Sequence, residues 1–154
     1  METKKKGRTT IRTAAICFLA SAVFEVLDVA APVPLLGAIR SGFAATVYHL
    51  IFTAIFFAMG IGLWSGKRWG YGVLMAGVAL YSIDKAQMLL ARQAFFDYIM
   101  QQFTIPGTRD IISLVPKEQV LQLMTLVYLV LVLCWWGFAL YIHLRRSYFT
   151  KNGI

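Results

Sequence analysis

The chain has 154 residues, of which 59% are hydrophobic and only 14% are charged. Soluble domains contain about 45–50% apolar and about 25% charged residues, so this composition excludes an ordinary soluble domain. The net charge of +8 does not indicate nucleic-acid binding, because the basic residues stand at the ends of apolar runs, where they set membrane topology. We expect a single integral membrane domain in contact with a lipid bilayer, without a nucleic-acid partner.

The apolar residues are grouped in four runs, each long enough to cross the roughly 30 Å hydrocarbon core of a bilayer as a helix. The predicted spans are residues 13–31, 43–64, 71–90 and 120–144. Short connections between successive spans require neighbouring helices to run in opposite directions. The sequence therefore predicts an all-α integral membrane protein, built as an antiparallel four-helix transmembrane bundle.

The beginning of the chain also has features of a secretory signal. A basic stretch, residues 1–12, precedes an apolar one, and Ala20-Ser21-Ala22 has the A-x-A pattern of a cleavage site. The apolar character continues past Ala22 to Leu36, which favours an uncleaved membrane span. Cleavage at Ala22 remains the alternative.

The connection 32–42 contains Pro, Gly and Arg40, which are signals of a turn. The second span then carries small residues at every fourth position, namely Ala54, Ala58, Gly62 and Gly66. This spacing stacks them on one helix face and lets a neighbouring helix approach closely. The neighbour is either another helix of this chain or a second copy in a homo-oligomer.

The third span has no Pro or Gly in its second half or directly after it. Its helix should either project beyond the membrane or break near Arg92 into a second helix along the surface. Residues 91–103 mix aromatic and polar side chains as an interfacial helix does. We expect an outer amphipathic segment over 91–119, with Pro116 in the first turn of the last helix. The tail 147–154 is short and polar.

Basic residues are unequally distributed between the two ends of the predicted spans. One side holds ten of them, Lys4, Lys5, Lys6, Arg8, Arg12, Lys67, Arg68, Arg145, Arg146 and Lys151. The other side holds four, Arg40, Arg92, Arg109 and Lys117. Because Lys and Arg are enriched in cytoplasmic loops, we predict that both termini are inside, in a bacterial-type inner membrane or a plasma membrane.

Polar side chains from all four spans fall at a similar depth. At about 1.5 Å per residue, Glu25 and Asp28 in the first span lie about 20–24 Å from the inner side. By the same measure, one residue from each of the other three spans lies about 21–25 Å from the inner side, namely His49, Asp84 and Tyr128. Glu25 and Asp28 are three residues apart and share a helix face. The sequence thus predicts one polar layer in the outer half of the membrane.

The candidate ligand- or ion-binding residues of this layer are Glu25, Asp28, His49, Asp84, Lys85, Tyr81 and Tyr128. A charge at the bilayer centre costs about 2.5–3.5 kcal/mol, so the carboxylates must pair, as one can with Lys85, or become neutral, or face water. Proton and ion pathways need such groups. The first predicted function is that the protein binds or conducts a proton, a metal ion or a polar ligand at this layer. Alternatively, the layer is a salt-bridge network that only fixes helix register.

Glu25, Asp28, His49 and Asp84 also have the ligand types of a divalent metal site, such as one for zinc. No compact motif such as HExxH accompanies them, and the sequence names no cofactor. Haem is not expected, because the two histidines, His49 and His143, fall at opposite membrane sides.

The two cysteines, Cys17 and Cys134, form no metal-binding motif and are not expected to form a disulfide. Both are predicted to be small buried apolar residues. No nucleophile elbow, phosphate-binding loop or dinucleotide-binding pattern is present, so an enzyme, such as one acting on lipid at the outer leaflet, is the least expected of the alternatives.

A second function class follows from the small size of the chain and its lack of a soluble domain. In this alternative the protein is a non-catalytic accessory or scaffold subunit of a larger membrane complex. The segment 91–119 would be its docking surface, with contacts through Phe95, Phe96 and Phe103.

Overall fold

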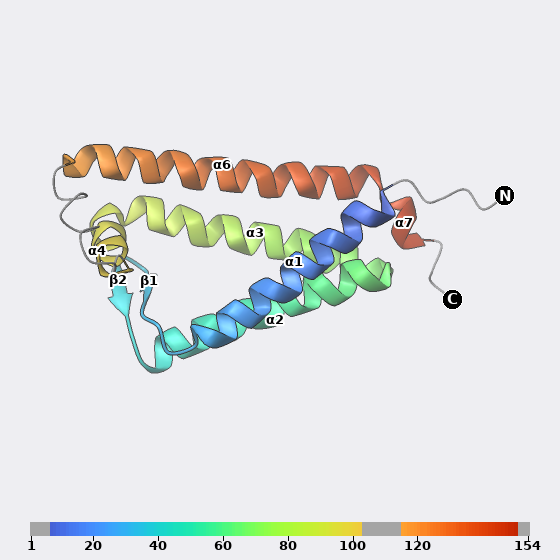
Figure 1. Cartoon of the computed structure of the whole chain (residues 1–154), viewed down its shortest axis with the longest axis horizontal. Helices are drawn as coiled ribbons and strands as arrows, with labels where there is room; N and C mark the ends of the chain where they lie inside the picture. Colours follow the sequence, from blue (N-terminus) through green and yellow to red (C-terminus); the bar gives the residue numbers. More distant parts are fainter. Residues whose placement is uncertain (1–6, 103–114, 151–154) are drawn as a thin grey trace.

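The computed structural model of the chain describes residues 7–102 and 115–150. Four long helices make up most of it, α1 (Arg8–Leu27), α2 (Phe43–Ser65), α3 (Arg68–Leu90) and α6 (Lys117–Leu144). Each is long and apolar enough to cross a membrane. The four predicted spans are thus confirmed as helices, and successive ones run in opposite directions within one bundle (Figure 1). Their orientation in a membrane remains a prediction.

The helix bounds differ from the predicted spans mainly at polar ends. α1 begins at Arg8 and ends at Leu27, so the range 13–31 was too late at both ends. Three of the four helices begin before their apolar run, because intrahelical hydrogen bonding continues through polar residues that hydropathy does not count. α2 ends where Gly66 adopts a left-handed conformation with φ 64°, which glycine adopts without strain.

Both described ends of the chain lie at the same end of the bundle (Figure 1). We call this the termini end; it contains the start of α1, the α2–α3 turn and α7 (Ser147–Thr150). The tail after α6 was predicted to be merely polar, and this was wrong. Phe149 in α7 is 1% exposed and packs into the main hydrophobic core, because an aromatic pair stands among the polar residues.

Glycines bring helices together near the termini end. A Cβ atom on Gly62 of α2 would lie 2.5 Å from the Cα of Gly70 in α3, so these two backbones are in contact. Gly60 likewise approaches α1, where a Cβ atom would meet the side chain of Leu19. Within the predicted small-residue stripe, Gly62 therefore packs inside this chain, whereas Ala54 is exposed.

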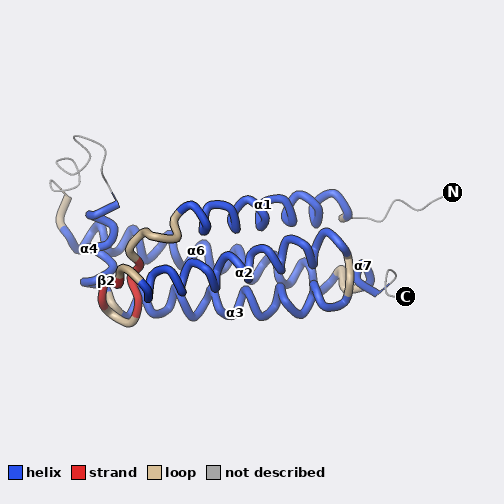
Figure 2. The backbone as a smooth tube through the Cα atoms, turned by 90° about the horizontal axis from the view of Figure 1, so that it is seen from below, coloured by secondary structure: helices blue, strands red, loops and turns tan. Residues whose placement is uncertain are grey.

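The opposite end, which we call the hairpin end, contains two short strands. β1 (Val33–Leu35) and β2 (Ala38–Arg40) pair antiparallel, with Val33 opposite Arg40. The turn between them places Leu36 and Gly37 at φ 52° and 79°, the left-handed conformation of a tight hairpin turn. Figure 2 shows the strands beside α4. The sequence predicted only a turn here, because two prolines hide the strand pattern.

α3 breaks at Ala91, and α4 (Arg92–Gln102) follows as a separate helix, which is one of the two predicted possibilities. Phe95 in α4 is 2% exposed and packs in a small core with Met88 and Leu121. The prediction that Phe95 belongs to an exposed docking surface was therefore wrong, since its ring fills the gap between α3 and α6. Phe103 lies outside the described residues.

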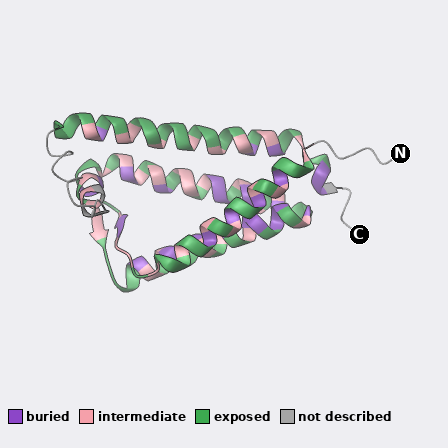
Figure 3. Ribbon diagram, in the orientation of Figure 1, coloured by how far each residue is buried: buried purple, intermediate pink, exposed green. Residues whose placement is uncertain are grey.

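The outer surface of the bundle is largely apolar, as lipid-facing helices require. α6 exposes most of its length (Figure 3), including many leucines. Cys17 and Cys134 are also exposed, so the prediction that they are buried was wrong. Their small apolar side chains suit a lipid-facing position as well as a core, and sequence alone does not separate the two environments.

Candidate functional site

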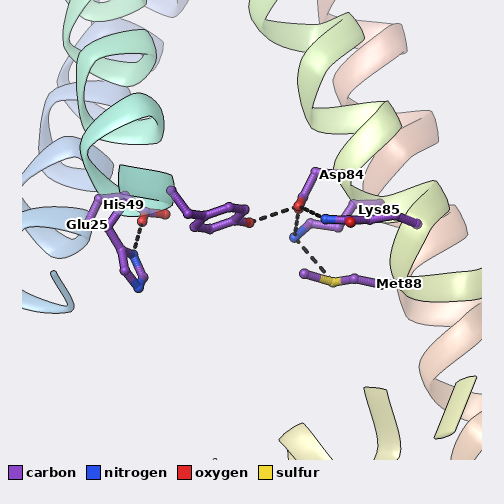
Figure 4. Close-up of polar contacts among 7 residues, drawn as sticks. Glu25, His49, Asp84, Lys85 and Met88 are labelled. Carbon is purple, nitrogen blue, oxygen red and sulfur yellow. Dashed lines mark hydrogen bonds and ion pairs between the residues drawn. The ribbon is translucent and has the colours of Figure 1, made fainter. Parts of the chain in front are cut away.

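The predicted polar layer consists of two groups of side chains (Figure 4). They come from the last part of α1, the first part of α2 and the last part of α3, which lie towards the hairpin end (Figure 1). The first group joins Glu25 near the end of α1 to His49 near the start of α2. The Nδ1 atom of His49 lies 2.7 Å from Oε2 of Glu25. The histidine is 6% exposed, and the glutamate side chain is 24% exposed. The pair is therefore shielded but borders the surface.

The second nitrogen of His49 has a partner that lies outside the helices. Its Nε2 atom lies 3.2 Å from the carbonyl oxygen of Ala31. The chain after α1 turns back at Asp28, where the amide of Ala31 donates to the Asp28 carbonyl at 2.7 Å. This turn leaves the Ala31 carbonyl directed at the histidine. Both ring nitrogens thus face oxygen atoms at hydrogen-bond distance.

The second group surrounds the carboxylate of Asp84 in α3, which is 5% exposed. Its Oδ1 atom accepts hydrogen bonds from the Tyr48 hydroxyl and from the Gln87 side-chain amide, both at 2.9 Å. Its Oδ2 atom accepts from Lys85 at 2.8 Å. Gln87 in turn accepts from the backbone amide of Leu36 at 3.0 Å. Asp84 thus connects α2, α3 and the strand hairpin.

The ammonium group of Lys85 is enclosed by aromatic rings. It lies 5.0 Å from the ring centre of Tyr81 and 5.3 Å from that of Tyr128, and its side chain is 13% exposed. Rings at these distances attract a cation through their negative faces. Tyr81 itself stacks on Trp135 of α6, with ring centres 4.2 Å apart. The two predicted tyrosines therefore hold the partner of Asp84 and tie it to α6.

The two groups are connected through consecutive residues of α2. Tyr48 and His49 lie edge to face, with ring centres 5.5 Å apart. Adjacent helical residues point in directions about 100° apart, so one residue reaches α3 and the other reaches α1. A shift of either ring therefore changes the contacts of its neighbour.

Asp28 and Tyr98 stand at the border of the layer. Asp28 caps the end of α1 and is exposed. Tyr98 belongs to α4, outside the candidate spans. Burial raises the pKa of the Tyr98 phenol, and the nearby carboxylates of Asp28, Glu25 and Asp84 raise it further. α4 therefore brings a neutral hydroxyl to the acidic side of the layer.

The four candidate metal ligands do not meet as one cluster. In the described parts of the chain, residues 7–102 and 115–150, no three His, Cys, Asp or Glu side chains come together to hold a metal ion. Glu25 pairs with His49, Asp84 is occupied by donors, and Asp28 is exposed. The geometry supplies two ligands in one place, where zinc normally needs three or four.

Tyr48, Gln87 and the Ala31 carbonyl were not among the residues predicted from the sequence. Gln87 had a detectable signal, because it lies one turn from Asp84 on the same helix face. The sequence signal for Tyr48 was weaker, since the direction of its side chain depends on how α2 is rotated. The Ala31 carbonyl had no sequence signal, because the direction of a backbone carbonyl outside a helix depends on the path of the turn.

The interface between α1 and α2 beyond the layer is largely apolar. Thr53 lies one turn beyond His49 on α2, and its buried hydroxyl has no hydrogen-bond partner among the described residues. Towards the termini end the buried side chains of α1 and α2 are hydrocarbon, aromatic or thioether groups, namely Ile11, Ala15, Phe18, Phe52, Phe56, Met59 and Leu63. The polar layer therefore borders an apolar barrier.

Comparison with known proteins does not place the chain in a family, since no family model, no curated protein and no solved structure matches it. The function proposed below therefore rests on the geometry of the polar layer.

Proposed function

We propose that this chain is a small membrane protein that binds and releases a proton at the Glu25–His49 pair. The observation that carries the proposal is that both ring nitrogens of His49 face oxygen atoms, Glu25 at 2.7 Å and the Ala31 carbonyl at 3.2 Å. The number of hydrogen bonds that a histidine can donate depends on its protonation state. This geometry is therefore satisfied by only one number of protons on Glu25 and His49 together.

The proton count follows from the hydrogen-bond inventory of the two side chains. A neutral histidine has one N–H, so beside an ionised Glu25 one of its nitrogens would point a lone pair at an oxygen. One additional proton removes this repulsion. Either both nitrogens of His49 donate, or a protonated Glu25 donates to Nδ1 while Nε2 donates to Ala31. In both arrangements the pair is electrically neutral and holds one exchangeable proton.

The surrounding charges are consistent with a site that changes by one proton. Asp84 and Lys85 compensate each other, and hydrogen bonds from Tyr48 and Gln87 satisfy the carboxylate further. A carboxylate held by an ion pair and two hydrogen bonds changes its charge less readily than a group at the exposed border of the layer. The Glu25–His49 pair is neutral at only one proton count and is partly accessible at the hairpin end. Asp84 therefore serves as support and the pair as the exchanging site.

The apolar interface beyond Thr53 favours binding over conduction. Protons move along chains of donors and acceptors, and the buried α1 and α2 side chains named above offer none. Exchange is then expected with the hairpin end only. On this basis the protein responds to the proton concentration on one side of the membrane.

In the alternative function the chain is an accessory subunit. Phe95 no longer supports that alternative, because its side chain is buried. The alternative predicts that the polar layer serves helix packing only. Nitrogen NMR of histidine-labelled protein distinguishes the two functions, because the chain has two histidines and His143 is an internal reference. In Glu25→Gln the amide can donate to Nδ1, so a neutral ring with a proton on Nε2 satisfies both contacts.

We expect Glu25→Gln to convert the His49 signals to those of this neutral form and to leave His143 unchanged. Glu118→Gln removes the same charge at an exposed position and should alter neither histidine. His49 signals that are identical in Glu25→Gln and wild type would contradict the proposal and favour a packing role.

A further inference from the structure

A hollow at the termini end has a different chemistry from the polar layer. It has a volume of about 390 Å³ and is lined by Arg68, Tyr71, Arg146, Ser147 and Phe149. This volume lies within the range of about 300–1,000 Å³ typical of small-molecule sites. The lining residues come from the start of α3 and from α7 with the turn before it, and these two helices are in contact.

The hollow carries positive charge that the residues described by the structure do not compensate. Neither the Arg68 nor the Arg146 guanidinium forms an ion pair or a side-chain hydrogen bond within residues 7–102 and 115–150. The described acidic residues all lie towards the hairpin end, and these are Glu25, Asp28, Asp84, Asp97 and Glu118. An anion that entered the hollow would therefore meet two arginines without a partner, and no carboxylate, among the described residues.

The backbone and the floor of the hollow add two further features. α3 begins at Arg68, so its first amides and the positive end of its dipole lie at the rim. The floor is aromatic, since Phe149 is 1% exposed and its ring centre lies 6.2 Å from that of Tyr71. The Tyr71 hydroxyl is already bonded to Nδ1 of His143 at 2.8 Å. The hollow thus combines a cationic rim with an apolar base.

We propose that this hollow binds the phosphate of an anionic phospholipid such as phosphatidylglycerol. Arg68 and Arg146 would bind the phosphate oxygens through their forked N–H groups, as arginine does with phosphate. The hollow stands where two candidate spans end, which is the depth of lipid headgroups. Basic pockets between membrane helices bind anionic headgroups at this depth. The aromatic base suits the glycerol and upper acyl chain and distinguishes a lipid from free phosphate.

The test uses the full chain in a neutral detergent, titrated with phosphatidylglycerol and followed by native mass spectrometry. The wild type should retain phosphatidylglycerol in preference to phosphatidylcholine. The double variant Arg68→Gln/Arg146→Gln should bind it about tenfold more weakly, because two charge-assisted phosphate contacts are lost. Both arginines are exposed, so the variant should unfold at the wild-type temperature.

The matched control is Arg8→Gln/Lys67→Gln, which removes the same charge from exposed positions at the same end without changing the lining of the hollow. It should keep the wild-type affinity for phosphatidylglycerol. Equal weakening by both double variants would overturn the proposal, because the attraction would then be that of a diffuse basic surface. Displacement of the lipid by inorganic phosphate would equally overturn it, since the hollow would then be a site for the free anion.

Discussion

The two ends of the bundle are held together by different kinds of contact. At the hairpin end, buried polar side chains join α1 to α2 and α2 to α3, through Glu25–His49 and Tyr48–Asp84. At the termini end, α2 and α3 touch through the backbones of Gly62 and Gly70. Polar contacts change with protonation, whereas backbone packing does not. The contacts at the hairpin end can therefore change with pH, whereas the junction at the termini end is fixed.

Charge is also distributed differently between the ends. The hairpin end compensates its buried charges internally, because Asp84 pairs with Lys85, and Glu25 pairs with His49 when that pair holds its proposed proton. At the termini end, the two arginines of the hollow are exposed and have no ion-pair partner among the described residues. Buried charges must be paired, whereas exposed charges remain hydrated or bind ions from outside. We therefore expect a proton site at the hairpin end and a lipid headgroup site at the termini end.

The largest effect is expected from Asp84→Ala at the hairpin end. The change leaves Lys85 without its counter-ion and Tyr48 and Gln87 without their acceptor. Breaking a buried ion pair in this way costs about 3–5 kcal/mol of unfolding free energy. Thermal unfolding in detergent measures it, with Asp97→Ala as the exposed control, which should stay near wild type. Equal unfolding temperatures for both variants would show that Asp84 does not hold the helices together.

Gly62→Ala tests the junction at the termini end. The new Cβ atom would lie 2.5 Å from the Cα of Gly70, so one helix must move. Overpacking of this kind costs about 1–3 kcal/mol. Gly72 is on the same helix as Gly70, but a Cβ atom there would meet nothing within 4 Å, so Gly72→Ala should be neutral or slightly stabilising. A wild-type unfolding temperature for Gly62→Ala would contradict a close backbone contact.

Removing one tyrosine hydroxyl at each end compares the two regions directly. Tyr48→Phe removes a hydrogen bond to a buried carboxylate, which should lower the unfolding free energy by about 1–2 kcal/mol. Tyr71→Phe removes an exposed hydrogen bond to His143 and should cost less than about 0.5 kcal/mol. Tyr48→Phe should also shift the His49 ring signals. The reverse order of stability would contradict the assignment of Asp84 as the polar link.

The smallest effect concerns alkaline pH. The folded state holds the Tyr98 proton more tightly than the unfolded state, because the pKa of this phenol is raised. Stability should therefore be unaffected below the unfolded tyrosine value of about 10 and fall as the pH rises from there towards the folded pKa. Tyr98→Phe should reduce this decline, and Tyr71→Phe should retain it. Parallel declines in wild type and Tyr98→Phe would refute this account of Tyr98.

Most of the fold could be predicted from the sequence, because apolar runs of membrane length are its strongest signal. The depth of polar residues also placed Glu25, His49 and Asp84 in one region. Their pairing could not be predicted, since it depends on how each helix is rotated and on a turn that presents the Ala31 carbonyl. The strand hairpin was not predicted for a similar reason. Prolines usually indicate a break in secondary structure, and only the pairing with the second strand shows that these residues form a strand.

In the proposed function, the Glu25–His49 pair satisfies both contacts of the His49 ring only when it holds one additional proton. The most direct measurement is a titration, from acidic to alkaline pH, of nitrogen-labelled histidine in bilayer-embedded protein, with the hydrogen bonds of both His49 nitrogens resolved. We expect the contacts to Glu25 and Ala31 to be present together while the pair holds its proton, and one of them to be lost on deprotonation. Persistence of both contacts after the proton has left would contradict it.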